Sequence, residues 1–270
     1  MKYFIGIDLG GTNVRTLLVD ENGTTYSEVK DNTERDNGPD YVCTKIIRQI
    51  ESLDTTVCGG MKGVSGIGIG VPGPVDTVKG AMIMATNLPG FENYPTCYYV
   101  TVSTGIGGAF IVDGKLVSGG RGHAGEIGNI IVKNNGYKFG TLNPGAVEGE
   151  ASGTAITRKG KELLGEDIVN HAGDVFRLAD EGDLKAQSIV EECISQLATL
   201  FANIAHTVDP HCFIIGGGVM KSKDYFYDKL VEQFNSKIHV GMQGHIPLLT
   251  TKLEDCGAIG AAMLPMSRLK

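Results

Sequence analysis

The sequence predicts an α/β protein whose two halves each combine helices with a mixed sheet that starts as a β-meander. Two glycine-rich turns, residues 8–12 and 104–108, each lie between short apolar stretches of the kind that form strands. Each of these strand pairs is followed by a further buried strand and by segments with apolar residues at helical spacing. The same order of elements therefore occurs twice along the chain.

The first half begins with the β-meander. Residues 3–9 alternate along the chain, and residues 14–19 form a second apolar stretch. Residues 21–23, Glu-Asn-Gly, are typical of a tight hairpin turn. A helix with one apolar face follows from Pro39, and residues 64–71 form a buried strand.

The second half repeats this order and adds a long helix. Residues 75–97, which join the halves, are irregular. Residues 98–103 and 109–112 form strands on either side of the second glycine turn. The remaining predicted elements are a helix at 184–208, a strand at 212–215, a helix at 225–234, a short strand near 246–249 and a helix at 256–264.

The composition is that of a globular protein without a nucleic-acid surface. The chain has 270 residues, of which 41% are hydrophobic and 20% are charged, and its net charge is −7. This negative charge argues against binding to nucleic acid. The six cysteines form no C-x-x-C pair, and most lie in apolar stretches, so we expect buried free thiols rather than disulfides or metal ligands.

The first glycine turn is a candidate phosphate-binding site. Gly10 and Gly11 lack the Cβ atom that would keep a phosphate away from backbone N–H groups, and Thr12 adds a hydroxyl. Asp8 suits a hydrated Mg²⁺, which prefers one or two carboxylates together with phosphate oxygens. The alternative is an ordinary hairpin with glycine at a sharp bend.

The second turn favours the phosphate interpretation because it repeats the pattern. It carries Thr104, Gly105, Gly107 and Gly108. Two such hairpins that face each other can hold a polyphosphate between them.

Further glycine-rich loops add candidate binding residues. Gly216, Gly217 and Gly218 follow a predicted strand, where they allow a flat ring such as adenine to approach; a tight strand–helix connection is the alternative. This cluster matches neither the Rossmann motif nor the P-loop. The carboxylates of Glu126 and Glu148 are suited to accept hydrogen bonds from vicinal hydroxyls of a sugar. The alternative is that they are solvated acids or charges at the N-terminus of a helix.

These motifs occur in the order seen in ROK proteins, and the chain resembles that family over nearly its whole length. The family comprises bacterial repressors, open-reading-frame products and sugar kinases. The resemblance implies an actin-like (ribonuclease H-like) two-lobed ATPase fold and a glucokinase- or fructokinase-like kinase that phosphorylates a hexose or an amino-sugar with ATP. The motifs that carry it are residues 8–12, 70–73, 87–90, 104–108, 124–128, 148–153 and 216–219.

The resemblance also implies roles for individual residues. Asp8 would hold Mg²⁺. Residues expected to bind ATP and its phosphates are Asp8, Gly10, Gly11, Thr12, Thr104, Gly105, Gly107, Gly108, Gly216, Gly217 and Gly218. Residues expected to bind the sugar are Gly73, Asn87, Glu126, Asn129 and Glu148.

We expect a shortened N-terminal lobe at residues 1–97 and a C-terminal lobe at 98–255. Residues 256–270 form a C-terminal helix that packs back on the first lobe. The resemblance further suggests a homodimer. No signal peptide or membrane span is visible, so we expect a cytoplasmic protein that acts on small molecules, with no nucleic-acid or membrane partner.

The chain departs from the family at its zinc site. Family members have a histidine at the position of Asn129 and a cysteine cluster just before Glu148. Residues 130–147 contain neither cysteine nor histidine. Because structural zinc needs four such ligands, we predict that the chain binds no zinc.

A second departure concerns catalysis. Family kinases carry an Asn-Asp-Ala-Asn segment before the second glycine turn, and its aspartate is the general base. Here only 17 positions separate Asn87 from Thr104, and no aspartate lies between them. The catalytic base is therefore unknown, with Asp76 and Glu126 as conceivable substitutes, and its loss costs about 10²–10⁴-fold in rate.

Three functions follow from these observations. The leading hypothesis is an ATP-dependent sugar kinase that uses Mg²⁺. The alternative is a non-catalytic protein that binds sugar or nucleotide, since the base segment is missing. A DNA-binding repressor is disfavoured, because the acidic chain opens directly into a predicted core strand and leaves no room for a helix-turn-helix.

Overall fold

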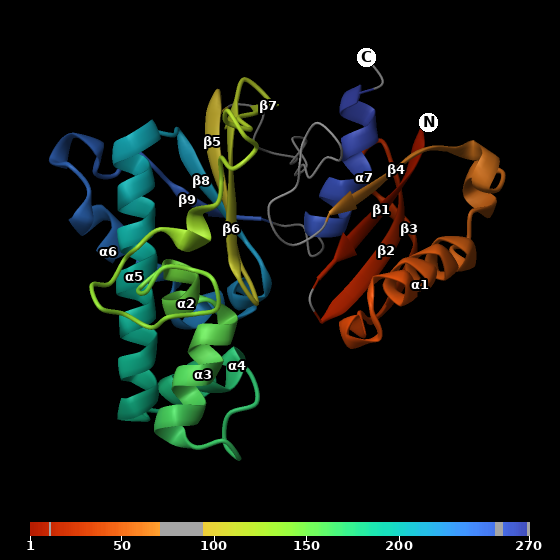
Figure 1. The fold of residues 1–270 in the computed structure, drawn as a ribbon. Coiled ribbons are helices and arrows are strands. Elements are labelled where there is room, and N and C mark those ends of the chain that lie inside the picture. The colour runs from red at the N-terminus through yellow and green to blue at the C-terminus, as the bar shows by residue number, and fades with distance from the viewer. Residues whose placement is uncertain (11, 71–93, 252–255, 269–270) are drawn as a thin grey trace. The chain divides into compact units, whose positions relative to one another are not determined.

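The computed structural model describes residues 1–10, 12–70, 94–251 and 256–268. The chain divides into two compact units (Figure 1). The first comprises Met1–Asn93, Gly114–His123 and Leu253–Lys270, and the second comprises Tyr94–Asp113 and Ala124–Lys252. The predicted lobe boundaries, 1–97, 98–255 and 256–270, stay predictions beside this division.

The first unit contains a four-stranded mixed sheet in the order β3-β2-β1-β4. β1 runs antiparallel to β2 and parallel to β4, and β2 runs antiparallel to β3. The strands are β1 (Tyr3–Leu9), β2 (Asn13–Asp20), β3 (Thr25–Asn32) and β4 (Val64–Gly70). This is the meander expected from the sequence. A strand also forms at the predicted place of β4, but the expectation that it is buried was wrong: Gly68 is its one buried residue, because β4 lies at the edge of this sheet.

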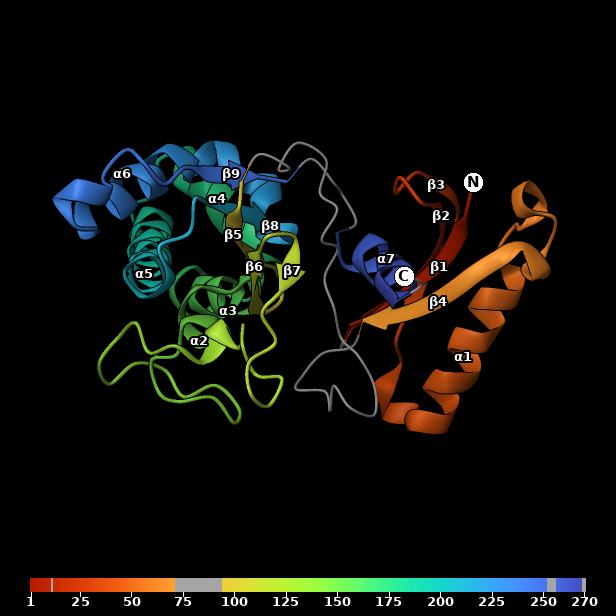
Figure 2. The same ribbon diagram turned by 90° about the horizontal axis from the view of Figure 1, so that it is seen from above.

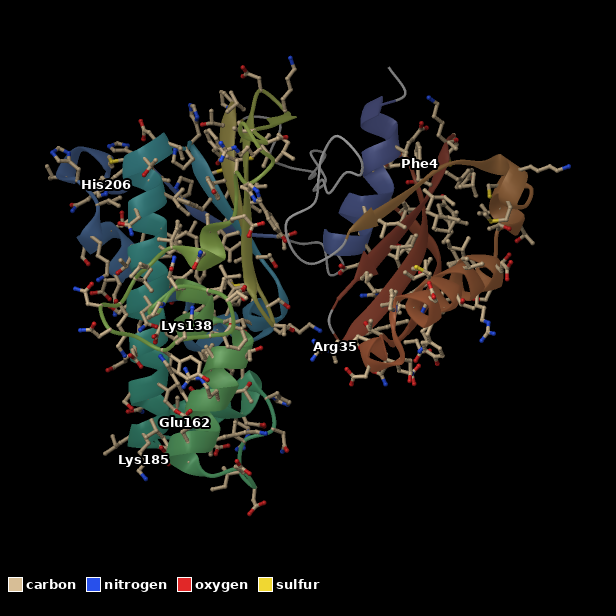
Figure 3. The ribbon with its side chains drawn as sticks, viewed as in Figure 1. Phe4, Arg35, Lys138, Glu162, Lys185 and His206 are labelled. Carbon is tan, nitrogen blue, oxygen red and sulfur yellow. The ribbon has the colours of Figure 1, made fainter. Side chains whose placement is uncertain are left out.

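Two helices cover opposite faces of this sheet (Figure 2). Alternate side chains of a strand point to opposite faces, so Phe4 packs with α7 (Cys256–Arg268), whereas Ile5 and Ile7 pack with α1 (Pro39–Ser52). Phe4 is fully buried in its cluster (Figure 3). Short 3₁₀ turns lie at Arg35–Asn37, Thr56–Cys58 and Met61–Gly63.

Helix α7 approaches the sheet over glycines. An added Cβ at Gly6 would lie 2.0 Å from the carbonyl oxygen of Ala258, and one at Gly68 would lie 1.7 Å from that of Ala261. Atoms cannot approach that closely, so only glycine permits this helix–sheet distance. The C-terminal helix is therefore part of the core of the first unit.

The sheet of the second unit repeats the order of the first. Strand β5 (Thr96–Val102) lies between the antiparallel β6 (Ile106–Val112) and the parallel β8 (Cys212–Gly216), as β1 lies between β2 and β4. β9 (Leu248–Thr250) pairs in parallel with β8, and the short β7 (Lys115–Leu116) follows β6 in sequence. The repeated strand order predicted from the sequence is thus present.

The core of the second unit surrounds α5 (Leu184–Val208). Asp183 caps this helix by accepting the N–H groups of Lys185 and Ala186, and Asp209 ends it in a left-handed conformation before Pro210. The other helices are α2 (Val147–Ala151), α3 (Gly153–Leu164), α4 (Ala172–Asp180) and α6 (Tyr227–Lys237), with 3₁₀ segments at Ile127–Asn129, Gly218–Tyr225 and Val240–Met242.

Aromatic side chains join this helix layer to the sheet. Phe201 of α5, Phe213 of β8 and Phe234 of α6 are fully buried, with ring centroids 5.0–6.3 Å apart. Burial of one such side chain contributes about 1.5–3 kcal/mol. No helix in the described part of the chain is both long and apolar enough to cross a membrane.

The thiols partly follow the sequence expectation. Cys43, Cys58, Cys97, Cys193 and Cys212 are free thiols. Cys97, Cys193 and Cys212 are buried, whereas Cys43 is exposed. Burial raises the pKa of the Cys193 thiol to about 12. The buried cysteines therefore act as small apolar core residues.

Candidate functional site

The first glycine turn joins β1 to β2 and is held from one side by Thr33. The Thr33 hydroxyl donates to the carbonyl of Gly10 at 2.6 Å, and its backbone N–H donates to the carbonyl of Thr12 at 2.8 Å. The Gly10 N–H donates to the Asn13 carbonyl at 2.8 Å. Gly11 lies outside the described residues. Two carbonyls of the turn are thus fixed by a residue just beyond β3.

Asp8 lies at the end of β1, opposite Arg15 of β2. Protein atoms packed around the carboxyl raise its pKa above the ordinary value although the side chain reaches solvent, and the positive charge of Arg15 acts in the opposite direction. An added Cβ at Gly257 would lie 2.5 Å from this carboxylate, so the first turn of α7 leaves it just enough room. One solvent-accessible carboxylate at a strand end fits a hydrated Mg²⁺ that also binds phosphate oxygens.

The second glycine turn is shorter than the sequence suggests. It comprises residues 103–105, because β6 already begins at Ile106. Gly107 and Gly108 therefore belong to the strand, where they pair with Thr101 and Val100. The expectation that the turn extends over residues 105–108 was wrong, since two apolar strands with a tight connection continue their pairing to the last possible residue.

Gly108 is needed for packing. Its N–H donates to the carbonyl of Gly125 at 3.0 Å, and an added Cβ would lie 2.6 Å from Ile127 and 2.9 Å from Tyr98. Its backbone donor is therefore already occupied. Among the described residues, no hydrogen bond occupies the N–H groups of Thr104 and Gly105.

The second turn is held by the start of α3. The Gly153 N–H donates to the Ser103 carbonyl at 2.7 Å, and the Thr154 hydroxyl donates to the Thr104 carbonyl at 2.8 Å. Ser152 caps α3 by accepting the N–H of Ala155. As in the first turn, a threonine hydroxyl fixes a carbonyl of the glycine turn.

Glu148 joins this turn to a second loop. Its carboxylate accepts the N–H of Ile106 at 2.8 Å. A Cβ added to Gly105 would lie 2.5 Å from this carboxylate, and one added to Gly128 would lie 3.2 Å from it. The structure therefore brings together Glu148, the second glycine turn and the 3₁₀ turn that ends at Asn129.

Asn129 and Glu126 are both exposed at the ends of this 3₁₀ turn. The Asn129 side-chain oxygen accepts the N–H of Asn143 at 2.7 Å. Its side-chain nitrogen is the group left to donate to a ligand.

The third glycine cluster lies against the end of β5. Gly216 ends β8, Gly217 has φ +97°, and Gly218 begins the next 3₁₀ segment. An added Cβ at Gly217 would lie 2.4 Å from the Val102 carbonyl oxygen, and one at Gly218 would lie 3.5 Å from the Ser103 hydroxyl. The cluster is thus adjacent to the second glycine turn.

Several predicted residues cannot be placed. Gly73, Asn87 and the substitute base Asp76 lie outside the described residues. Sequence analysis missed Thr33 and Thr154, which no local motif marks, because each reaches a turn that is distant in sequence.

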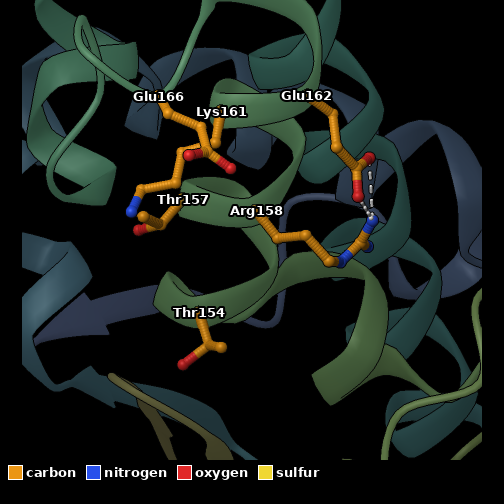
Figure 4. A pocket seen from close by; sticks show the side chains of 6 residues that line it. All are labelled: Thr154, Thr157, Arg158, Lys161, Glu162 and Glu166. Carbon is orange, nitrogen blue, oxygen red and sulfur yellow. Dashed lines mark hydrogen bonds and ion pairs between the residues drawn. The ribbon is translucent and has the colours of Figure 1, made fainter.

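A surface pocket of about 470 Å³ lies over α3 and contains none of the predicted site residues. One wall is the ion pair of Arg158 with Glu162 (Figure 4). The residues that line it are Thr154, Thr157, Arg158, Lys161, Glu162 and Glu166.

Comparison with known proteins identifies the family. The ROK family model matches residues 4–97 and 91–268. The chain belongs to the ROK family. The glucokinase of Thermotoga maritima is 28% identical over 314 aligned positions, which cover 98% of each chain. An N-acetylmannosamine kinase of Escherichia coli is 36% identical over 168 residues, which cover 62% of this chain and 55% of the relative.

Solved structures of ROK proteins share the fold. The ROK hexokinase from Thermus thermophilus superposes with a TM-score of 0.79 at 24% identity and covers 99% of each chain. A ROK glucokinase from Streptomyces griseus, in complex with glucose and AMPPNP, has a TM-score of 0.80 at 24% identity, covering 98% of this chain and 99% of that one. The predicted α/β, actin-like fold is confirmed.

The family model matches the chain in two separate segments rather than in one. The first segment ends at residue 97 and the second begins at residue 91, so the two overlap at residues 91–97. The alignment with the Thermotoga glucokinase has 314 positions, 44 more than the 270 residues of this chain. Relatives therefore carry residues that this chain lacks, and the break in the family match lies where the base segment is missing from the sequence.

Proposed function

We propose that this ROK protein is an ATP-dependent sugar kinase that transfers the γ-phosphate of ATP to a sugar hydroxyl. The observation that supports it best is the contact of Glu148 with the second glycine turn, which joins a predicted sugar ligand to a predicted phosphate site. Its relatives include a glucokinase and an N-acetylmannosamine kinase, and the Streptomyces glucokinase binds glucose and an ATP analogue.

Each group of residues has a distinct task in this proposal. Gly216, Gly217 and Gly218 accommodate the adenosine, because bare backbone allows a flat ring to approach. The N–H groups of Thr104 and Gly105, with Gly10, Gly11 and Thr12 of the other turn, bind phosphate oxygens. The sugar hydroxyls bind Glu126, Asn129 and Glu148, together with Gly73 and Asn87.

Glu148 orients the sugar and stabilises the phosphate turn at the same time. One carboxylate oxygen accepts the Ile106 N–H, and the remaining lone pairs are available to sugar hydroxyls. Charge-assisted hydrogen bonds of this kind are roughly twice as strong as neutral ones. Backbone N–H groups fixed in advance then stabilise the charge that develops on the transferred phosphoryl group.

We also propose that Asp8 holds Mg²⁺ when ATP binds. The ion would neutralise phosphate charge and orient the leaving group. Two further proposals rest on the family resemblance and the composition: a homodimer, and a cytoplasmic location. Light scattering on the purified chain tests the first, and cell fractionation the second.

The missing base segment limits the rate. Phosphoryl transfer passes through a loose transition state and depends mostly on positioning and electrostatics, so transfer without a dedicated base is slow rather than impossible. A general base contributes about 10²–10⁴-fold. The same absence favours a second candidate function, a protein that binds sugar and nucleotide without catalysis.

A coupled assay for ADP release, run beside calorimetry, separates the two functions. Glucose and N-acetylmannosamine are the first sugars to test, since the relatives act on them by name. ADP release that depends on one sugar supports the kinase. Binding of both ligands without turnover supports the binding protein.

A further inference from the structure

The loop of residues 130–146 joins two predicted sugar-binding residues, Asn129 and Glu148. The ends of the loop are held together: the Val147 N–H donates to the Ile130 carbonyl at 2.8 Å, and the Val132 N–H donates to the Gly145 carbonyl at 2.9 Å. The Asn129 side chain accepts a hydrogen bond from Asn143, within the loop. A shift of the loop would therefore act on Asn129 directly, and on Glu148 through Val147 at the start of α2.

A buried carboxylate lies under this loop. Glu150 of α2 is 1% exposed, and its carboxylate accepts the N–H of Tyr137 at 2.5 Å. It forms an ion pair with Lys159 of α3 at 3.2 Å. An added Cβ at Gly136 would lie 2.3 Å from the same carboxylate, so the loop backbone packs directly on Glu150.

The charge network continues to α5 and returns to the loop. Lys159 also pairs with Glu192 at 2.9 Å, and Glu192 pairs with Lys133 of the loop at 2.5 Å. Burial alone would raise the pKa of the Glu192 carboxyl, but hydrogen bonds from the two lysines outweigh it and lower that pKa. The loop is thus attached to the helices through both Tyr137 and Lys133.

A stacked cation makes a third attachment. The Arg158 guanidinium lies 3.6 Å from the ring centroid of Tyr137 and donates to the Gly149 carbonyl at 3.2 Å. Within the loop, the ammonium of Lys138, which is labelled in Figure 3, donates to the Leu142 carbonyl at 2.6 Å. Cation–π contacts of this kind contribute to stability when partly desolvated.

The residues of this loop do not fit zinc. Residues 130–147 contain no cysteine or histidine, and the Asn129 side chain is engaged with Asn143. In the described ranges of the chain, no three metal-binding side chains gather at one place. Four-coordinate structural zinc requires such a set.

We propose that Glu150 and Lys159 are positioning residues that hold the loop of residues 130–146 in place without a metal ion. Their buried charges, linked to Glu192 and Lys133, fix the loop so that Asn129 and Glu148 keep their places for the sugar. The consequence for the sugar rests on the proposed function, whereas the attachment of the loop does not. A buried ion pair is costly to break from one side because it leaves an unpaired charge, so this network defines the loop conformation sharply.

Hydrogen exchange tests the attachment independently of any ligand. In Glu150→Gln the side chain can still accept the Tyr137 N–H, but Lys159 loses one of its two carboxylate partners. We expect amides of the loop, including those of Tyr137, Asn143 and Gly145, to exchange at least about tenfold faster, while those of α5 change little.

Two further variants calibrate this result. Lys133→Met, which alters a half-exposed partner of Glu192, is the milder variant and should give a smaller change of the same kind. Lys229→Met serves as the control. It removes an exposed ion pair between Lys229 of α6 and Glu191, which lies next to Glu192 on α5, and no change is expected in the loop.

Calorimetry then tests the consequence for the sugar. We expect Glu150→Gln to weaken binding of the sugar that the native chain binds by at least about tenfold, and that of Mg-ATP by less than threefold, because Gly153 and Thr154 hold the phosphate turn independently. A purely structural role would lower stability without this difference between the two ligands. Exposure of the native chain to a strong zinc chelator should change neither loop exchange nor sugar binding.

The outcomes separate the two proposals. Unchanged loop exchange in both Glu150→Gln and Lys133→Met, or about one zinc ion per purified chain whose removal loosens the loop, would overturn the metal-free attachment. A native chain that binds neither glucose nor N-acetylmannosamine would instead count against the proposed function, and loop exchange would still decide the attachment.

Discussion

At the scale of single residues, the two glycine turns depend on threonines that hold their carbonyl groups. Thr33 is 3% exposed and donates its hydroxyl to Gly10, and Thr154 does the same for Thr104. Glycine leaves the backbone of these turns open to the proposed phosphate ligands but also gives the turns freedom to move. The threonine hydroxyls remove part of that freedom, because each fixes one carbonyl of its turn.

Thr33→Val tests this role with a side chain of the same shape. The partly buried Gly10 carbonyl would lose its partner, which costs about 1 kcal/mol in the free energy of unfolding. We expect the affinity for Mg-ATP to fall severalfold as well, because the turn becomes less ordered.

The control for this substitution is Thr44→Val, where an exposed hydroxyl donates to the Asp40 carbonyl within α1. Urea unfolding and calorimetry measure the two effects. Equal stability and equal affinity in both variants would show that Thr33 does not hold the turn.

Where a local motif marks a candidate site residue, its position in the fold could be predicted from the sequence. Asp8, Gly10 and Thr104 lie in short glycine motifs, and the structure places them at the ends of strands as predicted. Thr33 could not be found in this way, because its role depends on how β3 returns alongside β2. The hydrogen bond between the Asn129 side chain and the Asn143 N–H could not be predicted either, because the two residues are 14 positions apart.

At the scale of elements, glycines in β1 and β4 set the distance between α7 and the sheet. An added Cβ at Gly68 would lie 1.7 Å from the backbone of α7. Backbone atoms at this distance cannot rotate away, so the helix itself must shift.

Gly68→Ala should therefore destabilise the first unit by about 1–3 kcal/mol, the usual cost of overpacking. Gly120→Ala is the matched control, because an added Cβ there meets no atom within 4 Å, and we expect it to be nearly neutral. Thermal unfolding followed by circular dichroism compares the two. A Gly68→Ala protein as stable as the native chain would mean that α7 does not pack this closely.

The ion pairs that Glu192 of α5 forms with Lys133 of the loop and with Lys159 predict that the stability of the protein depends on pH. The folded pKa of Glu192 is lowered, so its stabilising effect is present above its unfolded pKa of about 4.3 and is lost as the pH falls through the lower folded value. We expect Glu192→Gln to cost about 1 kcal/mol at neutral pH, as for partly exposed ion pairs, and progressively less below about pH 4.3.

Glu191→Gln, on the same helix with a long and exposed ion pair to Lys229, should show almost no difference at any pH. Urea unfolding at a series of pH values measures both variants. A cost for Glu192→Gln that stays constant down to pH 3 would contradict the charge network.

Most elements could be predicted from periodicity, and the errors have local causes. The long helix is predicted at the residues of α5, because its apolar spacing and the stop at Asp209 and Pro210 agree. The second glycine turn is shorter than predicted, because Gly107 and Gly108 lie in β6. Gly108 is glycine because a larger side chain there would collide with Ile127 and Tyr98.

At the scale of the whole molecule, two units of similar topology carry different parts of the proposed machinery. The first contains Asp8 and one phosphate turn, and the second contains the other turn, the third glycine cluster and the acidic sugar ligands. The repeated strand order was visible in the sequence because both halves use the same strand–turn–strand pattern. The predicted lobe bounds stay predictions, because the division of the chain into units depends on contacts between distant segments.

Phosphorus-31 NMR of the chain with Mg-ATP and glucose, or with N-acetylmannosamine, tests the central claim most directly, because it separates a sugar phosphate from inorganic phosphate. We predict that a sugar phosphate and ADP accumulate in equal amounts, slowly for lack of the usual base, and that Asp8→Asn reduces the rate by at least about 100-fold. If both ligands bind and no sugar phosphate forms above the rate without protein, the chain is not a sugar kinase.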